Sequence, residues 1–497
     1  MAHRIFSATI SGLEAILVEI EADQGGGEFG QISIVGLPDA LVKESQERVR
    51  SAIKNSGYEF PKRKITINLA PTSIRKKGPQ YDLPIALAIL GLKNEIRISP
   101  RKIFVVGELS LSGKTKGIKS ILPLIILAAK EGFSEVFVPA ENIQEASILN
   151  NLRIFPISSL TQMANFMFKG LAITSKQIAK PTPQITLNNQ IIWQKIVGQN
   201  QAKRAAEISL AGGHHLLLIG PPGAGKTMIA KAMAKTIPEN TEKNSLEVAN
   251  IKSIYGLSTK NSNYFQGMFR AVHHSSSKLS ILGGGKTMYP GEISLSHHGI
   301  LFLDEFTEFS KETINALRQP MEEEKILVSH AEESCYFPCS FILVATMNPC
   351  PCGHYSDEEI ICNCRPKQLL NYQQKIPGPI LDRFDLQIRV NRPKNMFLEN
   401  YCPSVENIKN ARIIQEQRGF LNGRCPEHSF DLISGLGESE KLFLERAISR
   451  FSCSERTKTK VIKIARTIAD LAGEQEISTS HLAEAFSLRS SDTICYN

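Results

Sequence analysis

Segments with helical spacing of apolar residues alternate with short strand-like runs along the first third of the chain. Asp39 is placed as a helix N-cap and Gly57 as a stop, and apolar residues recur between them at helical spacing. Short strand-like runs of apolar and β-branched residues surround this segment, at residues 30–37, 64–70, 102–111 and 135–140. The pattern predicts a domain in which strands and helices are mixed.

Residues 173–190 show no hydrophobic periodicity and contain two prolines and many polar residues, as is typical of a linker. Strand-like and helical segments alternate again over residues 191–390, which favours a parallel sheet covered by helices. Over residues 391–497 only the helical rhythm continues. The sequence therefore predicts domains at 1–172, 191–390 and 391–497. The linker at 173–190 joins the first two, and the third follows the second directly.

The composition, with 497 residues of which 42% are apolar and 22% charged, suits a globular protein of two or three domains. No apolar run approaches the roughly twenty residues of a membrane helix, and the first residues lack the features of a secretory signal. We therefore expect a cytoplasmic protein without a membrane partner, whose ten cysteines stay reduced. The net charge of +9 is compatible with nucleic-acid binding, although a solvated basic surface is the commoner reason for it.

A glycine-rich segment follows a strand-like run and precedes a helical one. Backbone N–H groups of such a loop surround phosphates, its lysine reaches the β and γ oxygens, and its hydroxyl ligates Mg²⁺. The segment consists of Gly220, Pro221, Pro222, Gly223, Ala224, Gly225, Lys226 and Thr227. The order of strand, loop and helix predicts a nucleotide-binding site.

Polar residues at the ends of two later strand-like runs complete the predicted chemistry. Asp304 is placed to join the shell of the Mg²⁺ ion, Glu305 to polarise the attacking water, and Asn348 to orient that water. The alternative is that they are ordinary solvated residues at strand ends. Arg383 and Arg456 are candidates to stabilise charge on the γ-phosphate, although a lone arginine among acids is more often part of a surface ion pair.

Several segments resemble the magnesium-chelatase-like AAA+ ATPases, specifically the ComM/YifB competence-protein group. They include "IVGQNQAKRAAEISLAGGHHLLLIGPPGAGKT", "GEISLSHHGILFLDEF", "MNPCPCG", "GPILDRFDL" and "KIARTIADLAG". The resemblance implies ATP with Mg²⁺ as cofactor, Walker A at Lys226 and Thr227, and Walker B at Asp304 and Glu305. It also implies sensors at Asn348 and Arg456, an arginine finger at Arg383, and a ring, most often a hexamer. Gly198 and Gln199 match the segment near the adenine.

The resemblance also implies an α/β fold class: an N-terminal Lon-protease-like α+β domain, a central AAA+ parallel αβα sheet domain and a C-terminal helical lid. In the Lon-like domain Gln80 occupies the place of the catalytic serine, and the expected lysine falls near Leu122 or Lys119. A glutamine amide cannot attack a peptide carbonyl. We therefore expect an accessory or DNA-contacting domain and no proteolysis.

The long segment between the predicted Walker A and B motifs contains Gly283, Gly284 and Gly285 followed by Lys286. In the family that the chain resembles, this insertion points towards the pore of the ring, where it could grip DNA phosphates. The alternative is an ordinary crossover loop. A second expected pore hairpin carries Glu332 and Glu333 at its turn, which would repel a phosphate backbone.

Two histidine pairs and a cysteine cluster are candidate metal sites. Adjacent residues of a strand face opposite ways, so we expect polar contacts rather than chelation from the pairs 273–274 and 297–298. The cluster, formed by Cys350, Cys352, Cys362 and Cys364, can converge on a structural Zn²⁺ ion. Reduced packing cysteines and a redox sensor remain the alternatives.

Two functions follow as hypotheses. One is an ATP-driven ring motor acting on single-stranded or branched DNA, with helicase and branch-migration activity in DNA uptake and recombination. The other is a chelatase-like ATPase that remodels a protein partner without nucleic acid. The fused N-terminal domain, the basic balance and Lys286 favour the first.

Overall fold

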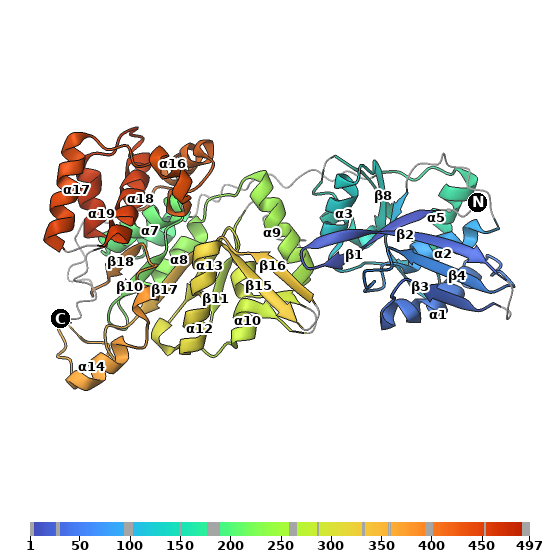
Figure 1. Cartoon of the computed structure of the whole chain (residues 1–497), viewed down its shortest axis with the longest axis horizontal. Coiled ribbons are helices and arrows are strands. Elements are labelled where there is room, and N and C mark those ends of the chain that lie inside the picture. Colours follow the sequence, from blue (N-terminus) through green and yellow to red (C-terminus); the bar gives the residue numbers. More distant parts are fainter. Residues whose placement is uncertain are drawn as a thin grey trace. The chain divides into compact units, whose positions relative to one another are not determined.

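The computed structural model describes most of the chain, in two compact units (Figure 1). The described residues are 4–25, 30–93, 103–149, 151–175, 189–257, 266–285, 288–330, 333–355, 357, 359–392, 401–451 and 454–489. One unit comprises Met1–Thr182 with two short later segments, Ala249–Tyr264 and Ala331–Tyr336. The other comprises Pro183–Val248, Phe265–His330 and Phe337–Asn497.

The N-terminal unit is built on a seven-stranded mixed sheet. In spatial order its strands are β3 (Ile32–Val35), β4 (Ile65–Ala70), β2 (Glu14–Gln24), β1 (Ile5–Ser11), β5 (Phe104–Val105), β8 (Glu135–Pro139) and β9 (Arg153–Ile157). The pairs β1·β2 and β2·β4 are antiparallel, and the other neighbours are parallel. A mixed sheet of this kind agrees with the predicted mixture of strands and helices.

Helices cover both faces of this sheet because its strand residues alternate between two cores. Val105 and Phe137 belong to the core under α1, α2 and α5, whereas Val106 and Val138 belong to the core under α3 and α4. The helices are α1 (Ala40–Asn55), α2 (Asp82–Gly91), α3 (Ile121–Lys130), α4 (Ile143–Ala146) and α5 (Leu160–Lys169).

The predicted helix at 39–57 is confirmed. Asp39 accepts a hydrogen bond of 2.8 Å from the N–H of Val42, as an N-cap does, and Gly57 lies beyond the end at φ +81°. The single strand expected at 102–111 is wrong. It divides into β5 and β6 (Glu108–Leu109), because the N–H and carbonyl of Gly107 bond to Gln80 and Leu83 instead of to a neighbouring strand. β6 pairs with β7 (Thr115–Lys116).

The second unit contains the predicted parallel sheet. Its order is β11 (Phe269–Val272), β14 (Ile300–Leu303), β17 (Ile342–Met347), β10 (Leu216–Ile219) and β18 (Leu386–Arg389). Every neighbouring pair is parallel, and Ile219, Met347 and Arg389 lie level in the register. The segments that follow all five strands therefore leave the same edge of the sheet, where ligands bind in such folds.

Helices surround this sheet and continue into a helical C-terminal region. The helices of this part of the chain are α6 (Asn189–Gln194), α7 (Asn200–Gly212), α8 (Lys226–Thr236), α9 (Glu242–Tyr255), α12 (Lys311–Ala316), α13 (Arg318–Glu323), α14 (Pro366–Gln373) and α15 (Gly378–Leu381). The second half of α9, from Ala249, is assigned to the other unit. The C-terminal helices, α16 (Val405–Arg418), α17 (Glu438–Phe451), α18 (Glu455–Ala472) and α19 (Thr479–Ser487), gather beside α7 (Figure 1). They share one apolar core with β10 and β18.

Two small hairpins interrupt the crossovers of the second sheet. One, between α10 (Lys278–Leu282) and α11 (Glu292–Leu295), pairs β12 (Gly283–Gly284) with β13 (Tyr289–Pro290). The other pairs β15 (Lys325–His330) with β16 (Glu333–Pro338). Within the described ranges no helix combines the length and apolar character needed to cross a membrane.

Candidate active site

The glycine-rich segment connects β10 to α8 at the carboxyl edge of the second sheet. Gly223 and Gly225 adopt φ of +79° and +92°, a region that glycine enters without strain, and α8 begins at Lys226. At Gly220 a Cβ would lie 2.0 Å from the carbonyl oxygen of Val390, so only glycine fits between the ends of β10 and β18. A loop of this kind that leads into a helix N-terminus offers backbone N–H groups and the positive end of the helix dipole to a phosphate.

Lys226 connects the loop to the neighbouring strand. Its Nζ donates hydrogen bonds to the carbonyls of Gly220 (2.6 Å) and Pro221 (2.9 Å) and to Oδ1 of Asn348 (3.1 Å). Burial lowers the pKa of Lys226 to about 8. Lys226 and Asn348, predicted from distant parts of the sequence, therefore lie in direct contact, because β10 and β17 are neighbours.

The two residues predicted to hold Mg²⁺ also meet. Thr227 Oγ1 donates to Asp304 Oδ2 at 3.1 Å, and Thr346 Oγ1 donates to the other carboxylate oxygen of Asp304. A hydroxyl and a carboxylate are oxygen donors of the kind that Mg²⁺ prefers. Thr346, which fixes the orientation of Asp304 from β17, was missed by the sequence reasoning, because a threonine inside a buried strand carries no local signal.

Glu305 projects from the end of β14 into solvent. Its backbone adopts φ +53°, its N–H points to Asp304 Oδ1 (3.2 Å) and Thr346 Oγ1 (3.3 Å), and its side chain is 61% exposed. Nδ1 of His274 lies 3.7 Å from Glu305 Oε2. His274 follows β11, the strand beside β14, so the sheet brings it to the same edge. It is a second residue that the sequence reasoning did not place in the site.

Gly198 and Gln199 precede α7 and lie against the phosphate loop. Both adopt positive φ, +64° and +57°. The side-chain amide of Gln199 donates to the carbonyl of Ala224 at 3.2 Å and to the carbonyl of Asn391. This segment therefore borders the site, as expected of the stretch near the adenine, and its contact with a base stays a prediction.

The two arginines have different surroundings. Arg383 is 9% exposed and donates to the Pro379 carbonyl and to the carboxylate of Glu322. Its Nε is buried and makes no hydrogen bond within the described part of the chain. Arg456, at the start of α18, is 74% exposed and lies 3.9 Å from Asp382. Their assignment as finger and sensor stays a prediction.

The expectation that paired histidines face opposite ways is wrong. The rings of His297 and His298 lie 3.9 Å apart, and both Nε2 atoms lie beside the same oxygen of Glu247, at 3.1 and 3.2 Å. The pair lies before β14 rather than within a strand, and φ of +50° at His298 turns the two rings to one side. The rings of His273 and His274, after β11, are also close, at 4.1 Å.

Glu247, His297 and His298 lie close enough together to hold a metal ion, but the contacts of His297 favour hydrogen bonding. Its Nδ1 accepts the N–H of Ser340 at 3.0 Å, which leaves the ring proton on Nε2, directed at Glu247. A metal-ligating histidine would instead donate its second N–H to an acceptor. Burial lowers the pKa of His297, which keeps the ring neutral, and the two imidazoles lower the pKa of Glu247.

The predicted DNA contacts are described only in part. Gly283, Gly284 and Gly285 adopt φ of +94°, +125° and +85°, and the first two pair in the β12–β13 hairpin. Lys286 and Glu332 lie outside the described residues, as does the side chain of Glu333.

In the N-terminal unit, Gln80 is a buried residue engaged in hydrogen bonds. Its amide donates to the carbonyls of Lys77 at 2.7 Å and Ala8 at 3.4 Å. Leu122 is fully buried in α3, and Lys119 is exposed just before that helix. The position assigned to the protease nucleophile is therefore held by an amide that fixes the backbone around it.

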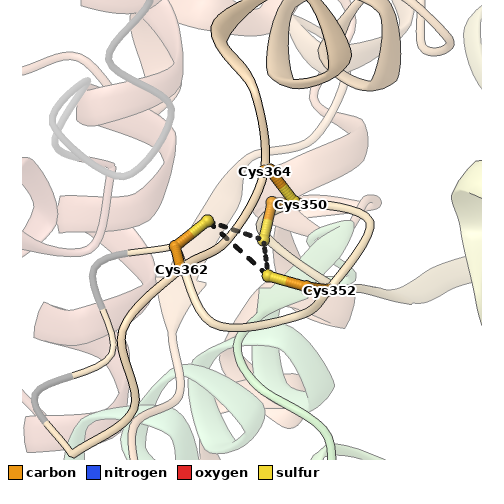
Figure 2. A group of neighbouring side chains, drawn as sticks. All are labelled: Cys350, Cys352, Cys362 and Cys364. Carbon is orange, nitrogen blue, oxygen red and sulfur yellow. Dashed lines mark hydrogen bonds between the residues drawn. The ribbon is translucent and has the colours of Figure 1, made fainter.

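Four cysteines converge immediately beyond Asn348 (Figure 2). Cys350 and Cys352 follow β17, and Cys362 and Cys364 precede α14. The Sγ atoms of Cys350 and Cys352 are 3.3 Å apart, those of Cys350 and Cys362 3.8 Å, and those of Cys352 and Cys362 3.6 Å. All four sulfur atoms lie within 4.8 Å of one another. The cluster adjoins the site described above.

The sheet order and the phosphate loop define a P-loop ATPase. Family models match three consecutive parts of the chain: "Subunit ChlI of Mg-chelatase" at residues 18–142, "Magnesium chelatase, subunit ChlI" at 192–398, and "Magnesium chelatase, subunit ChlI C-terminal" at 403–489. The competence protein ComM of Haemophilus influenzae is 37% identical over 496 residues, which cover 98% of this chain and 97% of ComM. YifB of Salmonella typhimurium is 37% identical over 495 residues, 97% of this chain and 96% of YifB.

The chain therefore belongs to the magnesium-chelatase-like AAA+ ATPases of the ComM/YifB family, which implies ATPase activity with ATP and Mg²⁺. A more distant similarity links it to Lon protease of Leptospira interrogans, 25% identical over 198 residues, which cover 35% of this chain and 24% of that protease. The similarity of this chain to Lon protease is therefore partial.

Proposed function

We propose that the protein is an ATP-hydrolysing ring motor that acts on DNA, with helicase and branch-migration activity in DNA uptake and recombination. In this proposal the loop N–H groups and Lys226 bind the β- and γ-phosphates. Thr227 and Asp304 hold Mg²⁺, which neutralises phosphate charge. Glu305 accepts a proton from the attacking water, and Asn348 orients that water. The contacts of Lys226 with Asn348 and of Thr227 with Asp304 support these assignments.

A ring supplies the remaining cation. Arg383 would stabilise the γ-phosphate charge of a neighbouring subunit, and Arg456 would contact the nucleotide of its own subunit. Within one chain Arg383 is paired with Glu322, whose side chain is 53% exposed. Engagement with a neighbour requires Arg383 to exchange this partner for phosphate. We propose a homo-oligomer, most simply a hexamer, located in the cytoplasm.

One observation carries the assignment of DNA as the substrate. The two hairpins inserted in the crossovers lie together: a Cβ on Gly284 would meet Val328 of β15 at 3.6 Å and Leu279 at 3.2 Å. Three consecutive glycines at positive φ leave little side-chain bulk on this surface, and Lys286 follows them in the sequence. A segment with little side-chain bulk that is followed in the sequence by a cation suits a phosphate backbone. The name "competence protein" of the relative ComM agrees with a DNA substrate.

The cofactors of the proposal are ATP and Mg²⁺ at the phosphate loop and a structural Zn²⁺ ion on Cys350, Cys352, Cys362 and Cys364. The alternative function, remodelling of a protein partner without nucleic acid, shares the ATPase site and differs only at the hairpins. A test must therefore separate basal ATP turnover from its response to DNA.

Single-stranded or forked DNA is expected to raise ATP turnover at least about threefold at low salt and less at high salt, because phosphate contacts release counterions. Lys286→Ala should remove the stimulation and retain basal turnover. Lys441→Ala, which removes a cation from exposed α17, is the matched control and should keep the stimulation. Turnover that does not respond to DNA at low salt would reject the DNA motor and favour protein remodelling.

Replacing His274 by alanine is expected to slow ATP hydrolysis about tenfold without changing ATP affinity, because its imidazole lies 3.7 Å from the carboxylate of Glu305 and limits the positions open to that carboxylate. The measurement is kcat together with the Kd of a fluorescent ATP analogue. His273→Ala is the control, since the ring of His273 bonds to Ser275 at 2.8 Å instead. Equal losses in both variants would show that His274 has no particular effect on Glu305.

A further inference from the structure

The spacing of the four sulfur atoms matches one kind of site. Tetrahedral zinc with bonds of about 2.3 Å to four thiolates places the sulfur atoms about 3.8 Å apart. A disulfide requires about 2.05 Å between its sulfur atoms. The observed separations of 3.3, 3.6 and 3.8 Å fit the tetrahedron and exclude a bond between these pairs as they lie.

Apolar packing does not account for the cluster. Only Cys350 is buried, while Cys352, Cys362 and Cys364 are each partly exposed. The backbone N–H of Tyr355 donates to Cys350 Sγ at 3.2 Å, a contact that supports a thiolate held by a metal. Figure 2 shows the four side chains, carried by two separate stretches of the same loop, pointing towards one common centre.

Residues close in the sequence to both cysteine pairs line one cavity next to Glu305. Glu305 and Asn348 line this cavity of about 430 Å³ together with Pro351, which lies between the first two cysteines. Asn371 and Tyr372 of α14, a helix that begins just after Cys364, form the other part of the wall. A link between the two cysteine pairs would therefore fix the position of α14 relative to Asn348.

The same loop also touches the phosphate loop directly. Gly353, at φ +84°, approaches Pro222 so closely that a Cβ would lie 2.6 Å from Pro222 Cδ. Because Gly353 follows Cys352 directly, a displacement of Cys352 would also move Gly353 against Pro222 of the phosphate loop. The cluster is thus in contact with the site through Asn348, through α14 and through Pro222.

We propose that Zn²⁺ bound by Cys350, Cys352, Cys362 and Cys364 positions the sensor loop, α14 and the phosphate loop, so that ATP turnover depends on zinc occupancy. The metal takes no part in the reaction; it joins residues 350–352 to residues 362–364. The proposal rests on the proposed ATPase function and is independent of whether DNA is the substrate.

Metal analysis of the purified full-length protein tests the site itself. We expect about one zinc ion per chain in the wild type and under about a third in Cys362→Ser/Cys364→Ser, which removes two of the four ligands. Cys402→Ser, at a cysteine outside the cluster, should keep its zinc. Cobalt replacing zinc should show the thiolate charge-transfer absorption of a four-sulfur site. Less than about a third of a zinc ion per wild-type chain would end the metal assignment.

Turnover tests the coupling. A heavy-metal chelator that leaves Mg²⁺ in place should lower kcat about tenfold, with the affinity for a fluorescent ATP analogue unchanged within about twofold, and added Zn²⁺ should restore kcat. Restoration distinguishes loss of position from misfolding. The coupling would be overturned if the wild-type protein contains a full complement of zinc and its kcat does not change after the zinc is removed. A protein that holds zinc but lacks ATPase activity altogether would overturn the proposed function instead, and missing DNA stimulation with a zinc-dependent kcat would overturn only the DNA assignment.

Discussion

ATP turnover is expected to fall about 10²- to 10⁴-fold when Glu305 is replaced by glutamine, while ATP remains bound. Glutamine keeps the size and exposure of the side chain but cannot accept a proton from water. The phosphate loop and its contacts with Asn348 and Asp304 stay intact. We expect bound, unhydrolysed ATP to hold the ring assembled, so that single-turnover hydrolysis, nucleotide retention and mass measured by light scattering together report the effect.

Glu312→Gln provides the matched control. Glu312 is an exposed carboxylate in the first turn of α12, and its replacement should leave turnover near the wild-type value. Unchanged hydrolysis in Glu305→Gln would show that another group activates the water and that Glu305 is misassigned.

Replacing Lys226 by alanine is expected to lower ATP affinity about 10- to 100-fold, the loss of roughly 1.5–3 kcal/mol from a hydrogen bond to a charged group, and to bring hydrolysis below detection. The lysine supplies the cation that reaches the β- and γ-phosphates. It also holds Asn348, so its loss releases the sensor side chain. Titration with a fluorescent ATP analogue and a steady-state phosphate assay measure the two effects separately.

Lys231→Ala is the control for this variant. Lys231 is an exposed residue of the same helix, so its removal changes the net charge equally without reaching the loop. Wild-type affinity in Lys226→Ala would place the phosphates elsewhere on the chain.

The chemistry at strand ends could be predicted because its signals are local. The strand, the glycine loop and the helix are contiguous, and Asp304, Glu305 and Asn348 each follow an apolar run. A parallel sheet brings such ends to one edge, so their convergence follows from the fold class. The contact between Lys226 and Asn348 depends on more, since it requires β10 to lie beside β17. No strand order was predicted, because no local signal in the sequence records which strands are neighbours.

The remaining parts depend on contacts between distant residues or on backbone torsions. His274 lies near Glu305 only because β11 pairs with β14, and no spacing in the sequence records that pairing. The histidines at 297 and 298 were given the geometry of a strand, whereas a left-handed residue turns both rings to Glu247. The burial of Arg383 against Glu322 is likewise a tertiary property, 61 residues apart in the sequence.

The additions to this ATPase are distributed along the sheet in an orderly way. The crossover from β11 to β14 carries the glycine hairpin, that from β14 to β17 the second hairpin, and that from β17 to β18 the cysteine cluster. The strands themselves tolerate no insertion, since a slip of one residue would turn Asp304 to the opposite face of the sheet. Each insertion can therefore be lengthened, exchanged or deleted separately while the residues of the ATPase site keep their positions on the sheet.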